Sequence, residues 1–187
     1  MIATAPSPQL APISRLEQFL IVGYGNEQHG DSAVGLTVAK QVADWHLSSV
    51  KTLSVPTLTP TIVSEMAQVG YVIFVSACRR RCAQTVQVDP IVLSNQEADP
   101  LSFSVDHCTP SVLLRLVKKL YNREPQSWLL QVAAESFEAK NVLSPVASDG
   151  CDRALRTIQQ FFTTYQRSPW MQPRRVVQTP ILQGQVA

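Results

Sequence analysis

Short apolar runs alternate with amphipathic segments along the middle of the chain. The runs at 19–23, 71–75 and 128–133 are almost wholly apolar, as expected of strands buried on both faces of a sheet. A further strand is predicted at 50–55. The segment 85–93 alternates less regularly, and its Pro90 indicates an edge strand broken at that residue. The pattern therefore predicts about five strands.

Four segments between and after these runs have apolar residues at the three- and four-residue spacing of helices. Asp31 and Ser32 supply N-cap chemistry for the first helix, and Thr59 with Pro60 opens a short one over 60–68. Thr109 and Pro110 open the third. The expected apolar faces of the first, third and last helices are Val34, Val38, Val42 and Trp45; Leu113, Leu116, Val117 and Leu120; and Cys151, Leu155, Ile158, Phe162 and Tyr165.

Strands that alternate with helices predict an α/β fold, a three-layer α/β/α sandwich around a mainly parallel sheet. The chain of 187 residues suits a single domain, which we expect over 17–167. Residues 1–16 contain three prolines and few large apolar groups in sequence, which indicates a disordered arm. Prolines at 169, 173 and 180 break any helix, so 168–187 is expected to be an extended tail.

Composition and charge argue against several classes of function. Apolar residues make up 45% of the chain and the net charge is only +2, so we expect no nucleic-acid partner. The longest basic run, Arg79–Arg81, is short for a binding patch. The N-terminus has no secretory pattern, and no stretch approaches the roughly 20 apolar residues that span a bilayer. We therefore expect a cytoplasmic protein.

The four cysteines are Cys78, Cys82, Cys108 and Cys151. They are too few for a disulfide scaffold in a chain of this length, and in a reducing compartment we expect free thiols. A soft metal site of Cys and His would favour zinc or copper, but the spacings match no known finger. We favour small apolar cysteines that fill the core.

Ligands of parallel sheets bind beyond the carboxyl ends of the strands. Three segments are expected there, at 23–31, 76–81 and 103–109, and each carries polar residues that a core does not require. The candidate binding residues in these segments are Asn26, Glu27, Gln28, His29, Arg79, Arg80, Arg81 and Asp106.

Gly23-x-Gly25 after a strand suggests a nucleotide-binding α/β protein as one alternative. The third glycine comes only at Gly30, and the second strand ends without the acid that would bind a ribose. We rank this alternative last.

Four segments, in order over residues 18–166, carry a resemblance to a known family. They are Gly23, Gly25, Asn26, Asp31 and Gly35 after the first strand; Ser76-Ala77 at the end of a later strand; Ser104-Val-Asp-His107; and Glu135-Ser-Phe-Glu138 followed by Leu143-Ser-Pro145. The chain resembles the nickel-iron hydrogenase maturation proteases. These are endopeptidases that trim the C-terminus of the hydrogenase large subunit, and the resemblance implies a phosphorylase/hydrolase-like topology.

The resemblance also implies a divalent-metal site built from two carboxylates and a histidine, a donor set that suits nickel. Here Ser32 and Ser76 occupy the carboxylate positions, and only His107 is retained. A hydroxyl that is neutral at pH 7 is a poor ligand, so we expect no cofactor unless the degenerate site still binds nickel or another divalent metal. Asp31 is a possible substitute ligand, although a helix N-cap suits it better. A Ser76–His107 dyad is conceivable.

Two functions follow from the resemblance. The first is a non-catalytic binding or assembly factor for a hydrogenase-like large subunit. The alternative is an active maturation endopeptidase with altered ligands. Fold alone does not decide between them.

Overall fold

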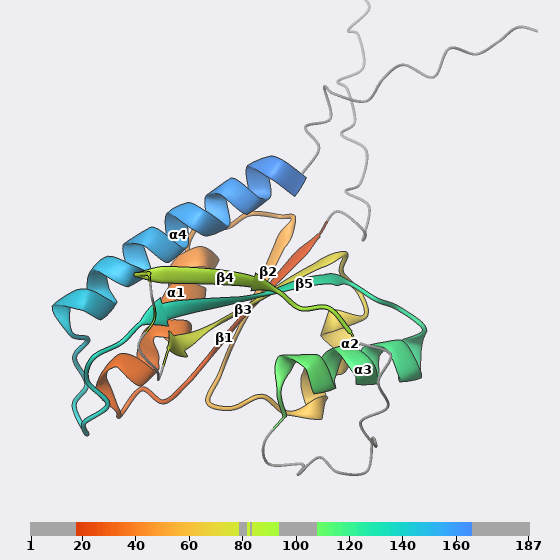
Figure 1. Cartoon of the computed structure of the whole chain (residues 1–187). Helices are drawn as coiled ribbons and strands as arrows, with labels where there is room; N and C mark the ends of the chain where they lie inside the picture. The colour runs from red at the N-terminus through yellow and green to blue at the C-terminus, as the bar shows by residue number, and fades with distance from the viewer. Residues whose placement is uncertain (1–17, 79–81, 83, 94–107, 166–187) are drawn as a thin grey trace, which may run out of the picture.

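The computed structural model describes residues 18–78, 82, 84–93 and 108–165. Its centre is a five-stranded sheet in the order β2-β1-β3-β5-β4 (Figure 1). The strands are β1 (Phe19–Tyr24), β2 (Val50–Val55), β3 (Tyr71–Cys78), β4 (Val86–Pro90) and β5 (Gln126–Ala133). The strands β2, β1, β3 and β5 pair in parallel, while β4 pairs antiparallel with β5 at one edge. The predicted mainly parallel sheet is confirmed.

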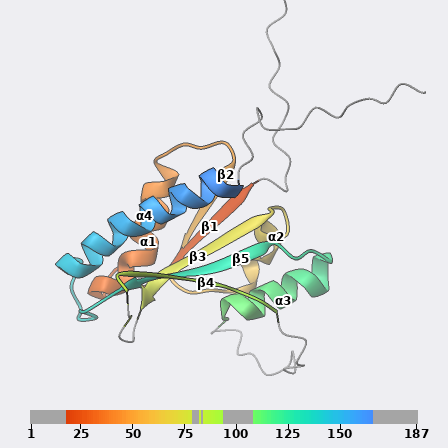
Figure 2. The same cartoon turned by 45° about the horizontal axis from the view of Figure 1, so that its top comes forward.

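Helices cover both faces of the sheet and complete three layers (Figure 2). One face packs against α1 (Val34–Ala43) and α4 (Pro145–Tyr165), and the other against α2 (Val63–Met66) and α3 (Pro110–Tyr121). Strand alternation decides the assignment, because Phe19 and Ile21 join the first core while Leu20 and Val22 join the second. The apolar strand runs thus serve two cores.

Several predicted helix details need correction. The segment predicted as one short helix is a 3-10 turn, η3 (Pro60–Ile62), followed by the single turn α2, and Thr59 makes no side-chain cap. Thr109 does cap α3, since its hydroxyl accepts the Val112 N–H at 3.3 Å. Leu120 was predicted on the buried face of α3 but is 66% exposed, and Leu114 is buried instead.

The first helical turn after β1 is also a 3-10 turn, η2 (Gly30–Ala33), which runs directly into α1. In the part of the chain that the structure describes, no helix is long and apolar enough to cross a membrane. The predicted arm at 1–16 and tail at 168–187 lie outside the described residues.

Candidate functional site

The turn that follows β1 is held against η2 and α1 by close backbone contacts. A Cβ at Gly23 would lie 1.9 Å from the carbonyl oxygen of Gly35, and a Cβ at Gly35 would lie 2.3 Å from that of Val75. Only glycine allows these approaches. They bring the start of α1 against the carboxyl ends of β1 and β3, where the sequence predicted the site.

Ser32 and Ser76 are both buried at this edge of the sheet. The Ser32 hydroxyl accepts a hydrogen bond from the backbone N–H of Asn26 at 3.2 Å. The Ser76 hydroxyl is hydrogen-bonded to the side chain of Tyr24. Tyr24 and Asn26 are two residues apart on one turn, so the structure brings the two serines to the same place.

Tyr24 was not among the predicted site residues. Burial raises the pKa of its phenol, and the hydrogen bond with Ser76 opposes that rise. The phenol is therefore neutral at pH 7 and is a hydrogen-bonding partner of Ser76. A tyrosine at the end of a buried strand carried no signal that would have separated it from a core residue.

Asp31 is fully buried and its carboxylate holds the loop between β5 and α4. One oxygen, Oδ2, accepts the backbone N–H groups of Glu135 at 2.7 Å and Ser136 at 2.9 Å. It also accepts the Ser144 hydroxyl at 2.8 Å, and Oδ1 accepts the Ser144 N–H at 2.6 Å. The backbone of η2 strengthens the link, since Asp31 N–H donates to the Ser136 carbonyl at 2.8 Å.

The expectation that Asp31 caps its own helix is wrong. No side chain caps η2 or α1. Ser144, held by Asp31, instead accepts the Ala147 N–H at 3.1 Å near the start of α4. Burial alone would raise the pKa of Asp31, but the hydrogen bonds from Ser144, Ser136 and Glu135 outweigh it and hold the pKa below its usual value. With four hydrogen bonds accepted, the carboxylate has a structural role.

The polar residues between Asn26 and His29 form the outer part of the turn. The Asn26 side chain accepts the Gln28 N–H at 2.9 Å, and Glu27 forms an ion pair with Lys40 of α1. Gln28 and His29 are exposed. Asn26 and Glu27 therefore shape the turn, whereas the side chains of Gln28 and His29 lie exposed on its surface. Arg79, Arg80, Arg81, Asp106 and His107 lie outside the described residues.

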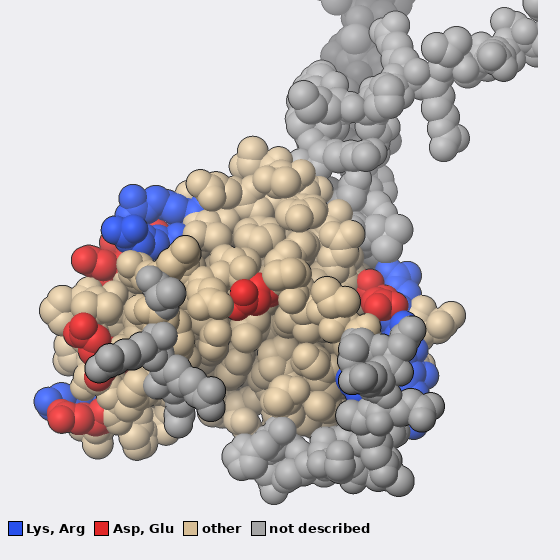
Figure 3. Space-filling model, viewed as in Figure 1, with Lys and Arg blue, Asp and Glu red and all other residues tan. Residues whose placement is uncertain are grey.

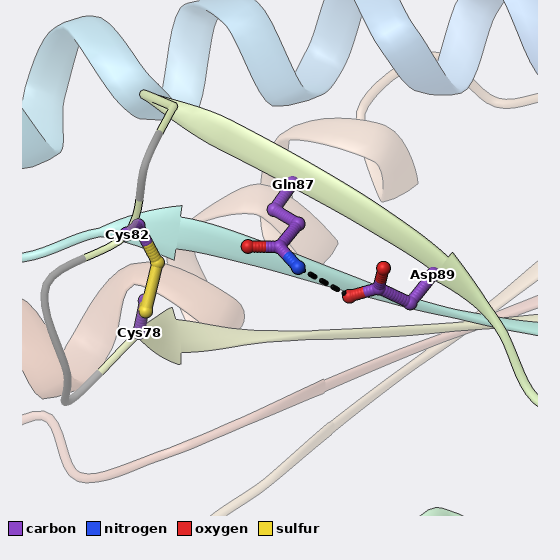
Figure 4. Close-up of a disulfide and its surroundings, with 4 residues drawn as sticks. All are labelled: Cys78, Cys82, Gln87 and Asp89. Atoms are coloured by element: carbon purple, nitrogen blue, oxygen red, sulfur yellow. Dashed lines mark hydrogen bonds between the residues drawn. A yellow bond between two sulfur atoms is a disulfide. The ribbon is translucent and has the colours of Figure 1, made fainter.

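Two of the four cysteines are not free thiols, contrary to the sequence prediction. Cys78, the last residue of β3, forms a disulfide with Cys82 (Figure 4). Their Cα atoms are 6.3 Å apart, within the range that a disulfide spans. The bond links the carboxyl end of β3, two residues beyond Ser76, to the segment that leads into β4.

Cys108 and Cys151 match the prediction of small apolar cysteines in the core. Both are buried free thiols, one in each core. Burial raises the pKa of the Cys108 thiol. For Cys151, burial and then the nearby Asp152 and Asp31 raise the pKa to about 11. Such thiols are protonated at neutral pH and are poor metal ligands.

The described donors at this edge do not fit a divalent metal. Ser32 and Ser76 offer neutral hydroxyls that already have partners, and Asp31 is engaged by Ser144 and its neighbours. Across the described residues there is no group of three His, Cys, Asp or Glu side chains that would hold an ion.

Solved structures identify the fold. Hydrogenase maturating endopeptidase HybD from E. coli superimposes with a TM-score of 0.61, covering 79% of this chain and 93% of its own at 19% identity. The [NiFe] hydrogenase maturation protease HycI from Thermococcus kodakarensis gives 0.60, with 79% and 93% covered at 16% identity. The chain has the fold of the hydrogenase maturation proteases. A hydrogenase 2 maturation peptidase from a Thaumarchaeota archaeon gives 0.57, with 77% and 97% covered at 14% identity.

No family model matches the chain, and no curated protein matches it either. Fold similarity at this level of identity leaves the activity open. Two residues that contact the candidate site residues were not predicted from the sequence, and these are Tyr24 and Ser144. Ser144 lies in the Leu143-Ser-Pro145 segment that carried the resemblance, but nothing local in the sequence showed that Asp31 is its partner.

Proposed function

We propose that this chain is a non-catalytic protein with the maturation-protease fold, which binds or helps to assemble a hydrogenase-like large subunit. One observation carries the proposal. The two positions at which the resemblance implies carboxylate ligands are buried serines that hydrogen-bond to the turn after β1. The turn keeps its glycine-dependent shape, so the surface around it persists without two of the implied ligands.

The chemistry of the donors explains why cleavage would be lost while binding of the partner is kept. Two carboxylates would contribute two negative charges to a cation site, and two hydroxyls contribute none. The Asp31 carboxylate cannot replace them without giving up the hydrogen bonds from the partly buried Ser136 and Glu135 N–H groups. His107 alone would bind a divalent ion weakly.

The partner surface in this proposal is the edge beyond β1 and β3. Gln28 and His29 are exposed there in the described residues. Arg79, Arg80 and Arg81 follow β3 in sequence and are the proposed contact for carboxylates on the partner, since guanidinium groups bind carboxylates with two hydrogen bonds.

The test is a pull-down of the full chain from its native host, followed by mass analysis of the partner's C-terminus. We expect a hydrogenase-like subunit whose C-terminus is not trimmed. The matched variants are Arg79→Glu with Arg81→Glu, expected to lose the partner, and Lys119→Glu with Arg123→Glu near the end of α3, expected to keep it.

Two outcomes would decide against the proposal. Specific trimming of the partner's C-terminus that His107→Ala abolishes would establish the active endopeptidase instead. Capture of no hydrogenase-like subunit would overturn the binding role.

A further inference from the structure

A groove runs between the edge strand β4 and helix α4, away from the turn after β1. It consists of two adjoining hollows of ≈ 690 Å³ and ≈ 360 Å³ that share Thr157. Gln84, Thr85 and Val86 line the first hollow on the strand side, and Val88 and Pro90 line the second. The groove thus follows β4 over its full length.

The strand wall of the groove includes a sheet edge. In the part of the chain that the structure describes, β4 pairs with β5 on one side only. Gln87 and Asp89 lie on the other face of β4, where the Gln87 amide donates to the Asp89 carboxylate at 2.8 Å (Figure 4). Val86 and Val88 therefore face the groove. Such an edge offers backbone hydrogen bonds to an added strand.

The helix wall changes chemistry along its length. Arg153 and Arg156 line the end near the start of β4, and Phe161 and Tyr165 with Trp128 line the other end. Figure 3 shows basic side chains gathered over α4 with acidic side chains beside them, next to a largely uncharged central face that has one acidic spot. Among the described residues, neither arginine forms an ion pair with a carboxylate. The Arg156 Nε instead donates to the Asp152 carbonyl oxygen.

The position of α4 is fixed where the groove begins. A Cβ at Gly150 would lie 2.3 Å from Val132 Cγ1 and 3.7 Å from the Thr85 carbonyl oxygen, so the helix approaches β5 and β4 closely there. The aromatic end is equally well packed, because the Trp128 ring lies 4.8 Å from Phe161 and 5.0 Å from Tyr165 between centroids. The groove is a preformed surface of packed elements.

Charge decides between two occupants. The chain's own residues 166–187 follow α4 directly, but they contain Arg167, Arg174 and Arg175 and no acidic residue. Two arginines in the groove repel such a segment and attract an acidic one. Guanidinium groups pair with carboxylates through two parallel hydrogen bonds.

We propose that the groove between β4 and α4 binds an extended acidic segment of a partner protein, which pairs with the free edge of β4. Its carboxylates lie at Arg153 and Arg156, and an apolar side chain lies at Trp128 and Phe161. The groove uses none of the residues assigned to the hydrogenase-like subunit. It is a second, independent interaction surface.

The test measures binding of fluorescent eight-residue peptides to the full chain by anisotropy. The probe alternates valine with threonine, with two glutamates at one end and a phenylalanine at the other, made in both orders. We expect one order to bind, and Arg153→Glu with Arg156→Glu to weaken it at least tenfold. The control Lys119→Glu with Arg123→Glu makes the same change in charge near the end of α3 and should bind as the original does.

Two further probes test how the peptide binds. A peptide with glutamine in place of glutamate should bind at least tenfold more weakly. N-methylation of one alternate set of peptide amides should abolish binding, while methylation of the other set should leave it intact, because an added strand turns only one set toward β4.

Three outcomes overturn the proposal. Neither peptide order binds; the Arg153→Glu with Arg156→Glu variant, with native circular dichroism, binds the peptide as well as the original chain does; or neither methylation pattern changes binding. A concentration-dependent dimer that the arginine variant disrupts would show instead that a second copy occupies the groove.

Discussion

At the scale of single residues, Asp31 shows how a local pattern misleads. An aspartate followed by a serine before a helix predicts an N-cap. Its actual partners, Glu135, Ser136 and Ser144, are 104, 105 and 113 residues away in sequence. Only the tertiary fold brings them within reach, so the local sequence at 31–35 could not predict the hydrogen-bond partners of Asp31.

Asp31→Asn is expected to lower the free energy of unfolding at pH 7 by about 2–4 kcal/mol, because it weakens hydrogen bonds to a buried charge. Urea unfolding measures the loss. Asp44→Asn, at an exposed aspartate that follows α1, is the matched control and should cost less than about 0.5 kcal/mol. A similar cost in both variants would contradict the role assigned to the Asp31 carboxylate.

The pH dependence of the same variant has a definite sign. The pKa of Asp31 is lowered in the fold, so its contribution to stability is present above the unfolded pKa of about 3.9 and disappears as pH falls through the folded pKa. The gap in unfolding free energy between the original chain and Asp31→Asn should therefore shrink below about pH 4. A gap that stays constant to pH 2.5 would count against this linkage.

At the scale of elements, the apolar runs determined most strand positions correctly. β2 matches its predicted range, and β1, β3 and β5 extend the predicted runs by one to three residues at an end. A strand buried on both faces is a continuous apolar run, and such a run can be recognised in the sequence without knowing which strands pair with it. The second helix was predicted too long. Leu58, Ile62, Val63 and Met66 give a helical apolar face, but only a 3-10 turn and one α-turn form.

The Cys78–Cys82 disulfide was beyond sequence reasoning for a different reason. Cysteines four residues apart form a disulfide only if the fold brings their Cα atoms within reach, and here these atoms are 6.3 Å apart. The sequence showed neither the antiparallel direction of β4 nor its neighbour. The small number of cysteines and the expected reducing compartment led to the prediction of free thiols. Among the four cysteines, this prediction is right only for Cys108 and Cys151.

Removal of the disulfide should have a modest cost. For a loop this short the chain-entropy model gives about 2 kcal/mol, so Cys78→Ser with Cys82→Ser should lower the free energy of unfolding by that amount. A dithiol reductant should lower the melting temperature of the original chain to that of the double variant, and it should leave the double variant unchanged. If reductant lowers the melting temperature of both proteins equally, or of neither protein, this bond does not stabilise the fold.

At the scale of the whole molecule, the layer architecture followed from the sequence, and so did the meeting of Ser32 and Ser76 at one edge, because parallel strands bring their carboxyl ends together. Tyr24 joins Ser76 at that edge, and Asn26 joins Ser32, as this rule implies. The hydrogen-bond partners of the Ser32 and Ser76 hydroxyls could not be predicted from the sequence, because they depend on the shape of the turn that Gly23 and Gly35 permit.

The original chain should have no tight divalent-metal site. Isothermal titration of the full chain with nickel or zinc is expected to give no stoichiometric binding below the micromolar range, because Ser32 and Ser76 add no charge and already have partners. A sub-micromolar site that His107→Ala abolishes would contradict the degenerate-site interpretation. Asp106→Asn serves as the neighbouring control, since it removes a charge without removing an imidazole.

The complementary experiment rebuilds the site within the whole fold. Ser32→Glu with Ser76→Asp places two carboxylates on buried positions of η2 and β3, so the variant without metal should melt lower than the original chain. If His107 lies beside them, nickel at 100 times its dissociation constant should add about 2.7 kcal/mol by mass action. For a chain of this size, that corresponds to a rise in melting temperature of about 5–11 °C. His107→Ala in the same background should remove most of this shift, because it takes away the nitrogen ligand that favours nickel. A folded double variant whose melting temperature ignores nickel would show that the two serines do not occupy the carboxylate positions of a metal site.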